Sequence, residues 1–230
     1  MPRIITENEW LIAIDKPAGL IVHGDGRTIE PSLAEWIGEN YPALRGIGGA
    51  WVSPQGESVA LNGLVHRLDR TTSGVVLAAK TQEAFDYLKQ EFKERRVEKK
   101  YLAWVYGETP EGHGTIIAEI MRSSEKPKRW YARPCDSTDI RAAITEWRVL
   151  EKREGATLVE VTPKTGRTHQ IRVHLASIGH PIVADHLYAP EREALFGFKR
   201  PALHALSVSV TLPNLERTIY EASLPPDFPQ

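Results

Sequence analysis

The feature that most constrains this chain is a short apolar run that directly follows a charged turn. Residues 75–79 read Val-Val-Leu-Ala-Ala, with Ser-Gly before them and Lys-Thr after them. A run of this length between such residues is typical of a buried strand. The turn ahead of it places the carboxylate of Asp69 between Arg67 and Arg70. Because loops held by a rigid strand commonly carry functional side chains, Asp69 is a candidate site residue.

By itself Asp69 is ambiguous, since an aspartate that merely pairs with an arginine in a turn gives the same pattern. The whole string at 66–74, His-Arg-Leu-Asp-Arg-Thr-Thr-Ser-Gly, is more specific. Together with the apolar run after it, this string resembles the central motif of the RluA-type RNA pseudouridine synthases. The resemblance implies that Asp69 is the catalytic nucleophile, the role of the aspartate in that family.

Composition is that of an ordinary soluble globular protein. The 230 residues are 41% hydrophobic and 26% charged, enough for one substantial core or two small ones. No apolar stretch has the length of a membrane span or of a signal-peptide core. The single cysteine, Cys135, cannot form an internal disulfide, so we expect a cytoplasmic protein. A net charge of −1 argues against non-specific coating of nucleic acid but leaves room for a local basic surface.

Local patterns predict an α+β protein. Strands are expected at 10–15, 75–79, 97–107, 115–121, 128–133, 141–150, 157–162 and 203–212. A first helix is expected at 32–41, capped by Ser32. A second is expected at 81–95, with an apolar face formed by Ala84, Phe85, Leu88 and Phe92. A third is expected to begin at a Thr168 cap and to end at Gly179, with Ile171, Leu175 and Ile178 toward the core. The Gly- and Pro-rich stretch 42–63 is expected to be a long loop, either closing over a substrate or a variable insertion. The tail 224–230 is expected to be loosely ordered.

Three further stretches resemble motifs of the same family. They are Asp-Lys-Pro-Ala-Gly-Leu-Ile-Val-His at 15–23, Lys-Lys-Tyr at 99–101, and Thr-Gly-Arg-Thr-His-Gln-Ile-Arg-Val-His-Leu at 165–175, which continues to Tyr188. Without the resemblance, the first is simply strand, turn and strand, and Tyr101 is a half-buried strand tyrosine. One departure is Ala184-Asp185, where the family usually has Gly-Asp, and it leaves the local geometry of that turn open.

The resemblance covers about residues 10–212 and implies a fold. We expect one catalytic domain over residues 1–230, with a mostly antiparallel, bent central sheet flanked by helices. Because the chain begins close to the first motif, we expect no accessory N-terminal RNA-binding domain. A monomer is the expected state.

The resemblance also implies roles for the other site residues. Arg172 pairs with Asp69 and favours its ionised form, and Tyr101 lies against the uracil ring and takes part in the later proton transfer. Arg67 fills the gap left when the target base is extruded. His66 is structural or shapes the substrate site. The predicted substrate-binding residues are His66, Arg67, Arg167, His169 and Gln170.

Uridine becomes pseudouridine when the base leaves ribose, turns and rejoins through carbon 5. The reaction needs no redox change or energy source, so we expect no cofactor. Whether Asp69 attacks the anomeric carbon or assists an elimination is left open. The motifs do not name the RNA: ribosomal RNA is the first expectation and transfer RNA the second.

A basic hairpin is the other candidate RNA surface. Its connection carries Arg122, Lys126, Lys128 and Arg129 beside Trp130 and Tyr131. Basic side chains can meet phosphates and the rings can stack on bases, although an ordinary charged hairpin tip has the same composition.

Two other function classes are weaker. A non-catalytic RNA-binding or ribosome-assembly protein on this fold does not explain why Asp69, Tyr101 and Arg172 occur together. A metal-dependent hydrolase would need clustered histidines, but His169 and His174 are five residues apart and lack the metalloprotease pattern. No phosphate-binding loop or dinucleotide fingerprint occurs, so we expect neither a metal site nor a nucleotide cofactor.

Overall fold

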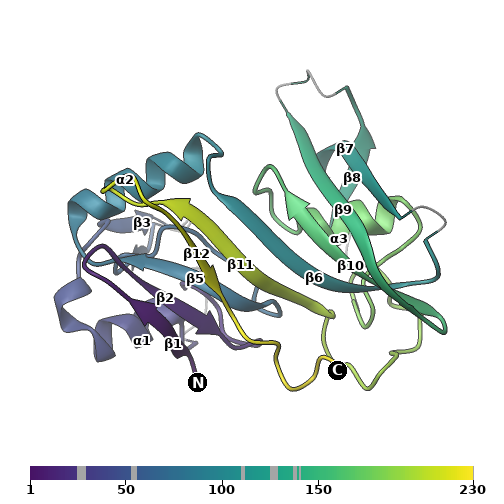
Figure 1. Ribbon diagram of the computed structural model, residues 1–230, viewed down its shortest axis with the longest axis horizontal. Helices are drawn as coiled ribbons and strands as arrows, with labels where there is room; N and C mark the ends of the chain where they lie inside the picture. Colours follow the sequence, from purple (N-terminus) through teal and green to yellow (C-terminus); the bar gives the residue numbers. More distant parts are fainter. Residues whose placement is uncertain are drawn as a thin grey trace. The chain divides into compact units, whose positions relative to one another are not determined.

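The computed structural model describes residues 1–24, 30–52, 56–109, 112–124, 129–136, 139 and 141–229. The strands are β1 (Arg3–Glu7), β2 (Leu11–Lys16), β3 (Ala50–Val52), β4 (Ser58–Ala60), β5 (Ser73–Ala79), β6 (Glu98–Tyr106), β7 (His113–Arg122), β8 (Trp130–Pro134), β9 (Ala142–Arg153), β10 (Ala156–Pro163), β11 (Leu203–Thr211) and β12 (Arg217–Glu221) (Figure 1). The helices are α1 (Leu33–Asn40), α2 (Gln82–Lys93) and α3 (Gln170–Ser177), with a 3-10 turn η1 (Pro42–Leu44). This content confirms the predicted α+β class. No helix in the described part is long and apolar enough to cross a membrane.

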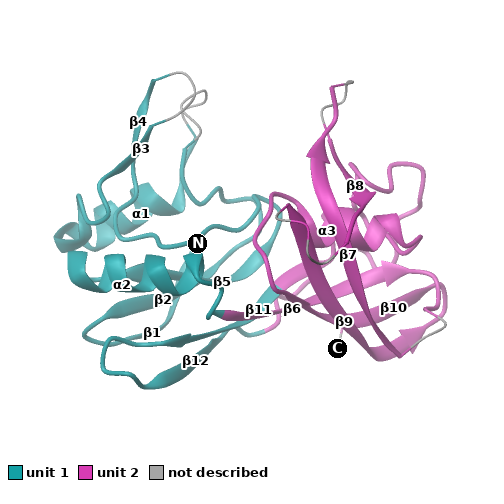
Figure 2. Cartoon of the chain, turned by 90° about the horizontal axis from the view of Figure 1, so that it is seen from above, with its two compact units in different colours: residues 1–97, 205–223 teal, residues 98–204, 224–230 magenta. Residues whose placement is uncertain are grey.

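The chain divides into two compact units, each assembled from two separate stretches (Figure 2). The first unit holds Met1–Val97 and Ala205–Ser223, and the second holds Glu98–His204 and Leu224–Gln230. The single domain expected over residues 1–230 and the bend of its sheet stay predictions.

The first unit is a sheet covered by a helix. Its strands lie in the order β1-β2-β5-β11-β12, and the pairs β1–β2, β2–β5 and β11–β12 are antiparallel. Every residue of β5 is buried, which confirms the strand predicted at 75–79. Helix α2 packs on this strand through Ala84, Phe85 and Leu88, the predicted apolar face, while Phe92 is half-buried.

The second unit is an antiparallel sheet in the order β6-β10-β9-β7-β8. Helix α3 packs against the strands β7 to β10. The predicted basic hairpin is β7–β8, in which Arg122 lies opposite Trp130. Two of its predicted basic residues, Lys126 and Lys128, lie outside the described residues.

Helix α1 begins as the sequence predicts. The Ser32 hydroxyl accepts a hydrogen bond from the Glu35 backbone N–H at 3.2 Å. The Glu35 carboxylate in turn accepts one from the Ser32 backbone N–H at 2.8 Å. This reciprocal capping box satisfies two donors that the first turn of a helix leaves unpaired.

The stretch 42–63 is more ordered than a long loop. It contains η1 and the hairpin β3–β4, in which Trp51 lies opposite Val59. The Trp51 ring also meets the His23 ring at a centroid distance of 5.4 Å. The stretch is rich in glycine and proline, which is typical of loops, and the two strands of three residues each were therefore not predicted. Residues 53–55 lie outside the described part.

The N-cap of α3 and the exposure of Ile178 differ from the prediction. The N-cap is His169, in a left-handed conformation with φ 55°, and not Thr168. Ile178 is 39% exposed, because the helix has already ended at Ser177. Gly179, at φ 84°, closes the helix as predicted: its N–H donates to Ala176 O, and the next N–H, of His180, donates to Leu175 O.

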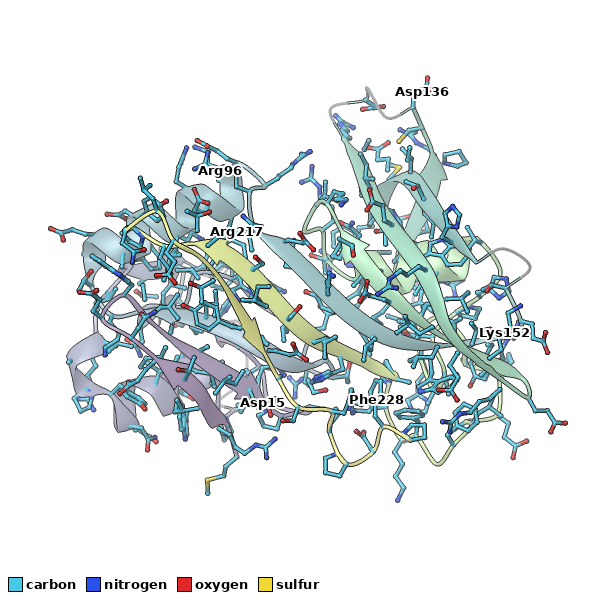
Figure 3. The ribbon with its side chains drawn as sticks, in the orientation of Figure 1. Asp15, Arg96, Asp136, Lys152, Arg217 and Phe228 are labelled. Carbon is cyan, nitrogen blue, oxygen red and sulfur yellow. The ribbon has the colours of Figure 1, made fainter. Side chains whose placement is uncertain are left out.

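The chain after residue 212 was predicted wrongly in two respects. β12 pairs with β11, so β11 is not the last strand. The described part of the tail, 224–229, is held in place: Phe228 is buried against Phe198, edge-on with ring centroids 5.2 Å apart (Figure 3). Asp227 accepts two hydrogen bonds from the Arg200 guanidinium, at 2.7 and 2.8 Å. Arg200 lies 27 residues before Asp227 in the sequence, and the local composition of the tail gives no sign of these contacts.

The fully buried His174 of α3 makes the stability of the fold depend on pH. Burial lowers the pKa of its imidazole to about 4 from an ordinary value of 6.5. Between pH 6.5 and 4 the unfolded chain therefore takes up a proton that the folded chain does not. We expect the free energy of unfolding to fall as pH falls through this window, by on the order of 2 kcal/mol from this residue. Urea unfolding from pH 7.5 to 4.5 measures it.

The variant His174→Gln should lose that part of the pH dependence, while His113→Gln, at an exposed position, should keep it. If the free energy of unfolding falls equally steeply with pH in the wild type and in His174→Gln, His174 is not the source of this pH dependence. Should the variant fail to fold, an NMR titration of His174 in the wild type decides the matter, since its ring should stay neutral at pH 5.

Candidate active site

In the first unit, the loop that carries Asp69 is pinned to β5. Val65 N–H donates to Leu77 O at 3.3 Å, and Leu64 forms a bridge with Ala78. Leu68 is buried, whereas Arg67 is exposed and Asp69 is half-buried. The Asp69 carbonyl accepts a hydrogen bond from Thr72 N–H at 3.1 Å, which closes the turn into β5. The buried side chain of Leu68 thus anchors the loop, while Arg67 and Asp69 on either side of it stay accessible.

His66, at the start of the same motif, also holds the loop against β5. Its Nε2 accepts a hydrogen bond from the Leu77 backbone N–H at 3.0 Å. Because a backbone N–H can only donate, this contact assigns the ring hydrogen of a neutral His66 to Nδ1. The ring stacks on Phe92 of α2 with centroids 4.7 Å apart. His66 therefore has a structural function here, and its contact with substrate stays a prediction.

Lys16 ties the first motif to the Asp69 motif. Its side chain is fully buried at the end of β2. The ammonium donates to the carbonyls of Pro17 at 2.9 Å, Leu20 at 2.8 Å and Arg70 at 3.3 Å. Gly19 N–H also donates to Arg70 O, at 2.8 Å. Burying an ammonium is costly unless its N–H donors form hydrogen bonds. These carbonyls therefore stabilise the buried Lys16, and Lys16 in turn fixes their positions.

Lys16 was not among the predicted functional residues, although it lies inside the motif at 15–23. The residues after the turn form one isolated bridge, between Ile21 and Ser32, and not a second strand. Arg70, which flanks Asp69 in the sequence, forms an ion pair with Glu30, in which both side chains are well exposed. A pair this exposed adds little stability.

In the second unit, Tyr101 lies on β6 opposite Val161 of β10 and is half-buried. Two residues earlier on the same strand, the Lys99 ammonium donates to Thr165 O at 3.3 Å. Burial lowers the pKa of Lys99 to about 8. Since residues two apart on a strand share a face, Lys99 and Tyr101 lie on one face of β6 beside the segment 165–170.

Gln170 shapes that segment. Its amide oxygen accepts hydrogen bonds from the Thr165 hydroxyl at 2.7 Å and from Arg167 N–H at 3.0 Å. Its amide nitrogen donates to Ile144 O at 3.0 Å and to the Thr145 hydroxyl at 2.9 Å. The buried Gln170 thus holds the turn on which Arg167 is exposed. Its predicted contact with substrate, like that of Arg167, stays a prediction.

Arg172 is held by a carboxylate that sequence analysis did not assign to it. Its Nε and one terminal nitrogen donate to the two oxygens of Asp185 at 2.7 and 2.8 Å. Both side chains are buried, with exposed fractions of 8% and 0%. A planar bidentate pair of this kind fixes the orientation of the guanidinium. The predicted pair between Arg172 and Asp69 joins residues of different units and stays a prediction.

The departure at Ala184-Asp185 has a geometric explanation. Ala184 has φ 57°, in the left-handed region where glycine carries no steric penalty. Its N–H donates to the Tyr106 hydroxyl at 3.1 Å. The Asp185 carboxylate accepts hydrogen bonds from the backbone N–H groups of Leu187 at 3.1 Å and Tyr188 at 3.2 Å. The turn therefore forms with alanine, and Asp185 still reaches Arg172.

The basic hairpin presents part of its predicted surface. Arg122, Arg129 and Tyr131 are exposed, and Trp130 is half-buried. Among the residues that the structure describes, no three His, Cys, Asp or Glu side chains are grouped closely enough to hold a metal ion.

Comparison with known proteins gives one consistent result. The sequence profile of the RNA pseudouridylate synthase family matches residues 10–177. The ribosomal large subunit pseudouridine synthase D of Nitrosomonas europaea is 38% identical over 98% of this chain and 63% of its own length. Synthase C of Vibrio cholerae is 34% identical over 94% of this chain and 63% of its own length. The chain thus spans about three fifths of the length of these relatives.

A solved structure has a similar fold over nearly the whole chain. Human RNA pseudouridylate synthase domain containing 1 is 25% identical, with a TM-score of 0.73 over 98% of this chain and 84% of that one. The human domain containing 4 gives the same score and identity.

Gly74, the last residue of the Asp69 motif, is required by packing within the first unit. It has φ 117°, and a Cβ atom there would lie 2.1 Å from Ala205 O on β11. Because the obstacle is backbone, it cannot move aside as a flexible side chain would. We expect Gly74→Ala to lower the free energy of unfolding by about 3 kcal/mol or more, measured by urea denaturation.

The matched control is Gly112→Ala, at a position where a Cβ atom meets nothing within 4 Å. It should change stability by less than about 0.5 kcal/mol. Equal effects of the two substitutions would mean that the close approach of β5 and β11 does not limit residue 74.

Proposed function

Because this chain belongs to the RNA pseudouridylate synthase family, we propose that it isomerises uridine to pseudouridine in structured RNA, most directly in ribosomal RNA. Its four motifs are those of RluA-type members. The choice of ribosomal RNA is supported by the names of several relatives, which are ribosomal large subunit pseudouridine synthases, and transfer RNA is the alternative substrate.

The observation that carries the proposal is the position of Asp69. Its carboxylate is half-buried on a loop that Leu68, His66 and Lys16 hold against β5. A nucleophile has to be held still relative to the scaffold and yet be reachable, and this loop provides both conditions. An aspartate that served only as the partner of an arginine would not need three separate anchors.

The main catalytic group that this isomerisation requires is a carboxylate. The bond between ribose C1′ and uracil N1 breaks, the base turns, and a bond between C1′ and C5 forms. The proton on C5 then leaves and N1 carries a proton, so atoms and electrons balance without a cofactor. In this proposal Asp69 is the nucleophilic carboxylate, Tyr101 contacts the uracil ring, and Arg172 supports the ionised form of Asp69.

The target uridine has to leave its stack before this chemistry can begin, which costs a few kcal/mol. The exposed Arg67 is proposed to occupy the space that the base vacates. Arg167 and His169 in the turn before α3, together with Arg122, Arg129 and Tyr131 of the β7–β8 hairpin, are proposed to contact the RNA backbone and bases. RNA shape and extruded loop bases would then determine which uridine reacts.

The proposal predicts that Asp69→Asn abolishes turnover. Release of tritium from RNA labelled at C5 of uridine follows the departure of the C5 proton directly. Total RNA from a strain that lacks the protein serves as substrate, followed by separated ribosomal and transfer RNA. The amide is a poor nucleophile of nearly the same shape, so release should fall by about a thousandfold or more.

The matched control is Asp86→Asn, an exposed aspartate on α2, which should release tritium like the wild type. Release from transfer RNA alone would replace ribosomal RNA as the substrate. If wild type and Asp69→Asn both bind RNA and neither releases label, the protein is a non-catalytic RNA-binding protein and the proposal fails.

A further inference from the structure

His169, a predicted substrate-binding residue, has an unusual backbone conformation. It is the N-cap of α3 with φ 55°, and no side-chain hydrogen bond caps the helix there. A left-handed conformation costs a residue other than glycine about 1 kcal/mol or more, so its surroundings have to hold it. The His169 carbonyl accepts the hydrogen bond from Val173 N–H at 2.9 Å, so the same strained residue also sets the first turn of α3.

Tyr188 holds the side chain of His169. Its hydroxyl lies 2.9 Å from His169 Nδ1, and the two rings meet edge-on with centroids 5.8 Å apart. The same hydroxyl oxygen accepts a hydrogen bond from the Trp130 backbone N–H at 3.2 Å, at the first residue of β8. One hydroxyl therefore links the turn before α3 to the start of the β7–β8 hairpin.

Tyr188 is itself fixed by the buried ion pair. The Arg172 guanidinium lies over its ring, 5.0 Å from the centroid. The Tyr188 backbone N–H donates to the Asp185 carboxylate at 3.2 Å, and that carboxylate also binds Arg172. Both the ring and the backbone of Tyr188 are thus positioned by the Arg172–Asp185 pair, and its hydroxyl has a defined place.

The Tyr188 hydroxyl can hold one tautomer of His169. Its oxygen accepts from Trp130 N–H, and its own O–H can donate to His169 Nδ1, which lies 2.9 Å away. When Nδ1 of a neutral imidazole accepts, Nε2 carries the hydrogen. His169 then offers an N–H donor, which suits a phosphate oxygen or a base carbonyl of RNA.

We propose that Tyr188 is a positioning residue for RNA binding: its hydroxyl holds His169 in the Nε2–H tautomer and in one orientation. This inference rests on the proposed function, since it assigns His169 to the RNA-binding surface of that enzyme. In this proposal Tyr188 connects three parts of the second unit: the Arg172–Asp185 pair, the turn before α3 and the β7–β8 hairpin.

The test is Tyr188→Phe, which keeps the ring over Arg172 and the backbone bond to Asp185 and removes only the hydroxyl. We expect KM for RNA to rise about tenfold, the effect of one oriented hydrogen bond, while kcat stays within about twofold. In the His169→Gln background, the same change should have no further effect on KM, because both substitutions remove one contact.

NMR of the His169 nitrogens separates positioning from a general structural effect. Wild type should show the Nε2–H tautomer, and Tyr188→Phe should show a mixture of both. The matched control, Tyr220→Phe, also removes a hydrogen-bonded hydroxyl, the one that accepts from Asn8 at 3.1 Å in the first unit. It should leave both the His169 signals and KM unchanged.

An Nδ1–H tautomer of His169 in the wild type would overturn the proposal, whether or not Tyr188→Phe folds. An unchanged KM in a folded Tyr188→Phe would also overturn it. If the wild type releases no tritium, the proposed function fails, but the NMR spectra and the RNA dissociation constant of Tyr188→Phe still decide the role of Tyr188.

Discussion

The buried ammonium of Lys16 is the interaction on which the Asp69 loop depends. Carbonyls of residues 17, 20 and 70 accept hydrogen bonds from it, so one charge joins a turn near the N-terminus to the residue directly after Asp69. Burying an ammonium is costly, and the cost is offset only while all its donors are bound. The geometry of the loop is therefore coupled to that of the turn, and neither can shift alone without exposing unpaired polar groups.

A second buried charge organises the other unit in a similar manner. Arg172 and Asp185 satisfy each other through two hydrogen bonds, and Asp185 also accepts two backbone N–H groups. Such pairs are weak contributors to net stability, but breaking one partner leaves an uncompensated charge in the interior. Their value here is geometric, because the pair sets Tyr188 and, through it, the strained N-cap His169.

Local patterns predicted the elements that local forces determine. The Ser32 cap, the apolar face of α2 and the buried run at 75–79 are each readable within a few neighbouring residues, and each is confirmed. The strands of the β3–β4 hairpin and β12 pair with partners close by in the sequence, and they were missed because each of them is only three to five residues long. The anchored tail was missed because its partner Arg200 lies 27 residues before Asp227. In the candidate site, the motifs predicted which residues act, a prediction that stays open, but they did not predict which contacts hold those residues. The roles of Lys16, Asp185 and Tyr188 arise from contacts across 13 to 58 residues of chain.

The two units are each discontinuous in sequence, and this has a consequence for how the chain becomes folded. The first unit takes most of β11 and all of β12 from Ala205–Ser223, after the chain has passed through almost all of the second unit. The second unit is in turn completed by the segment that carries Phe228. On the ribosome, β5 must wait for its neighbour β11 until more than 120 further residues have been synthesised. Neither unit can therefore be completed during most of translation. Helix α2 follows β5 directly and can pack on it early, but the edge of β5 that pairs with β11 stays unpaired until late. Unpaired strand edges make an incomplete chain prone to aggregation.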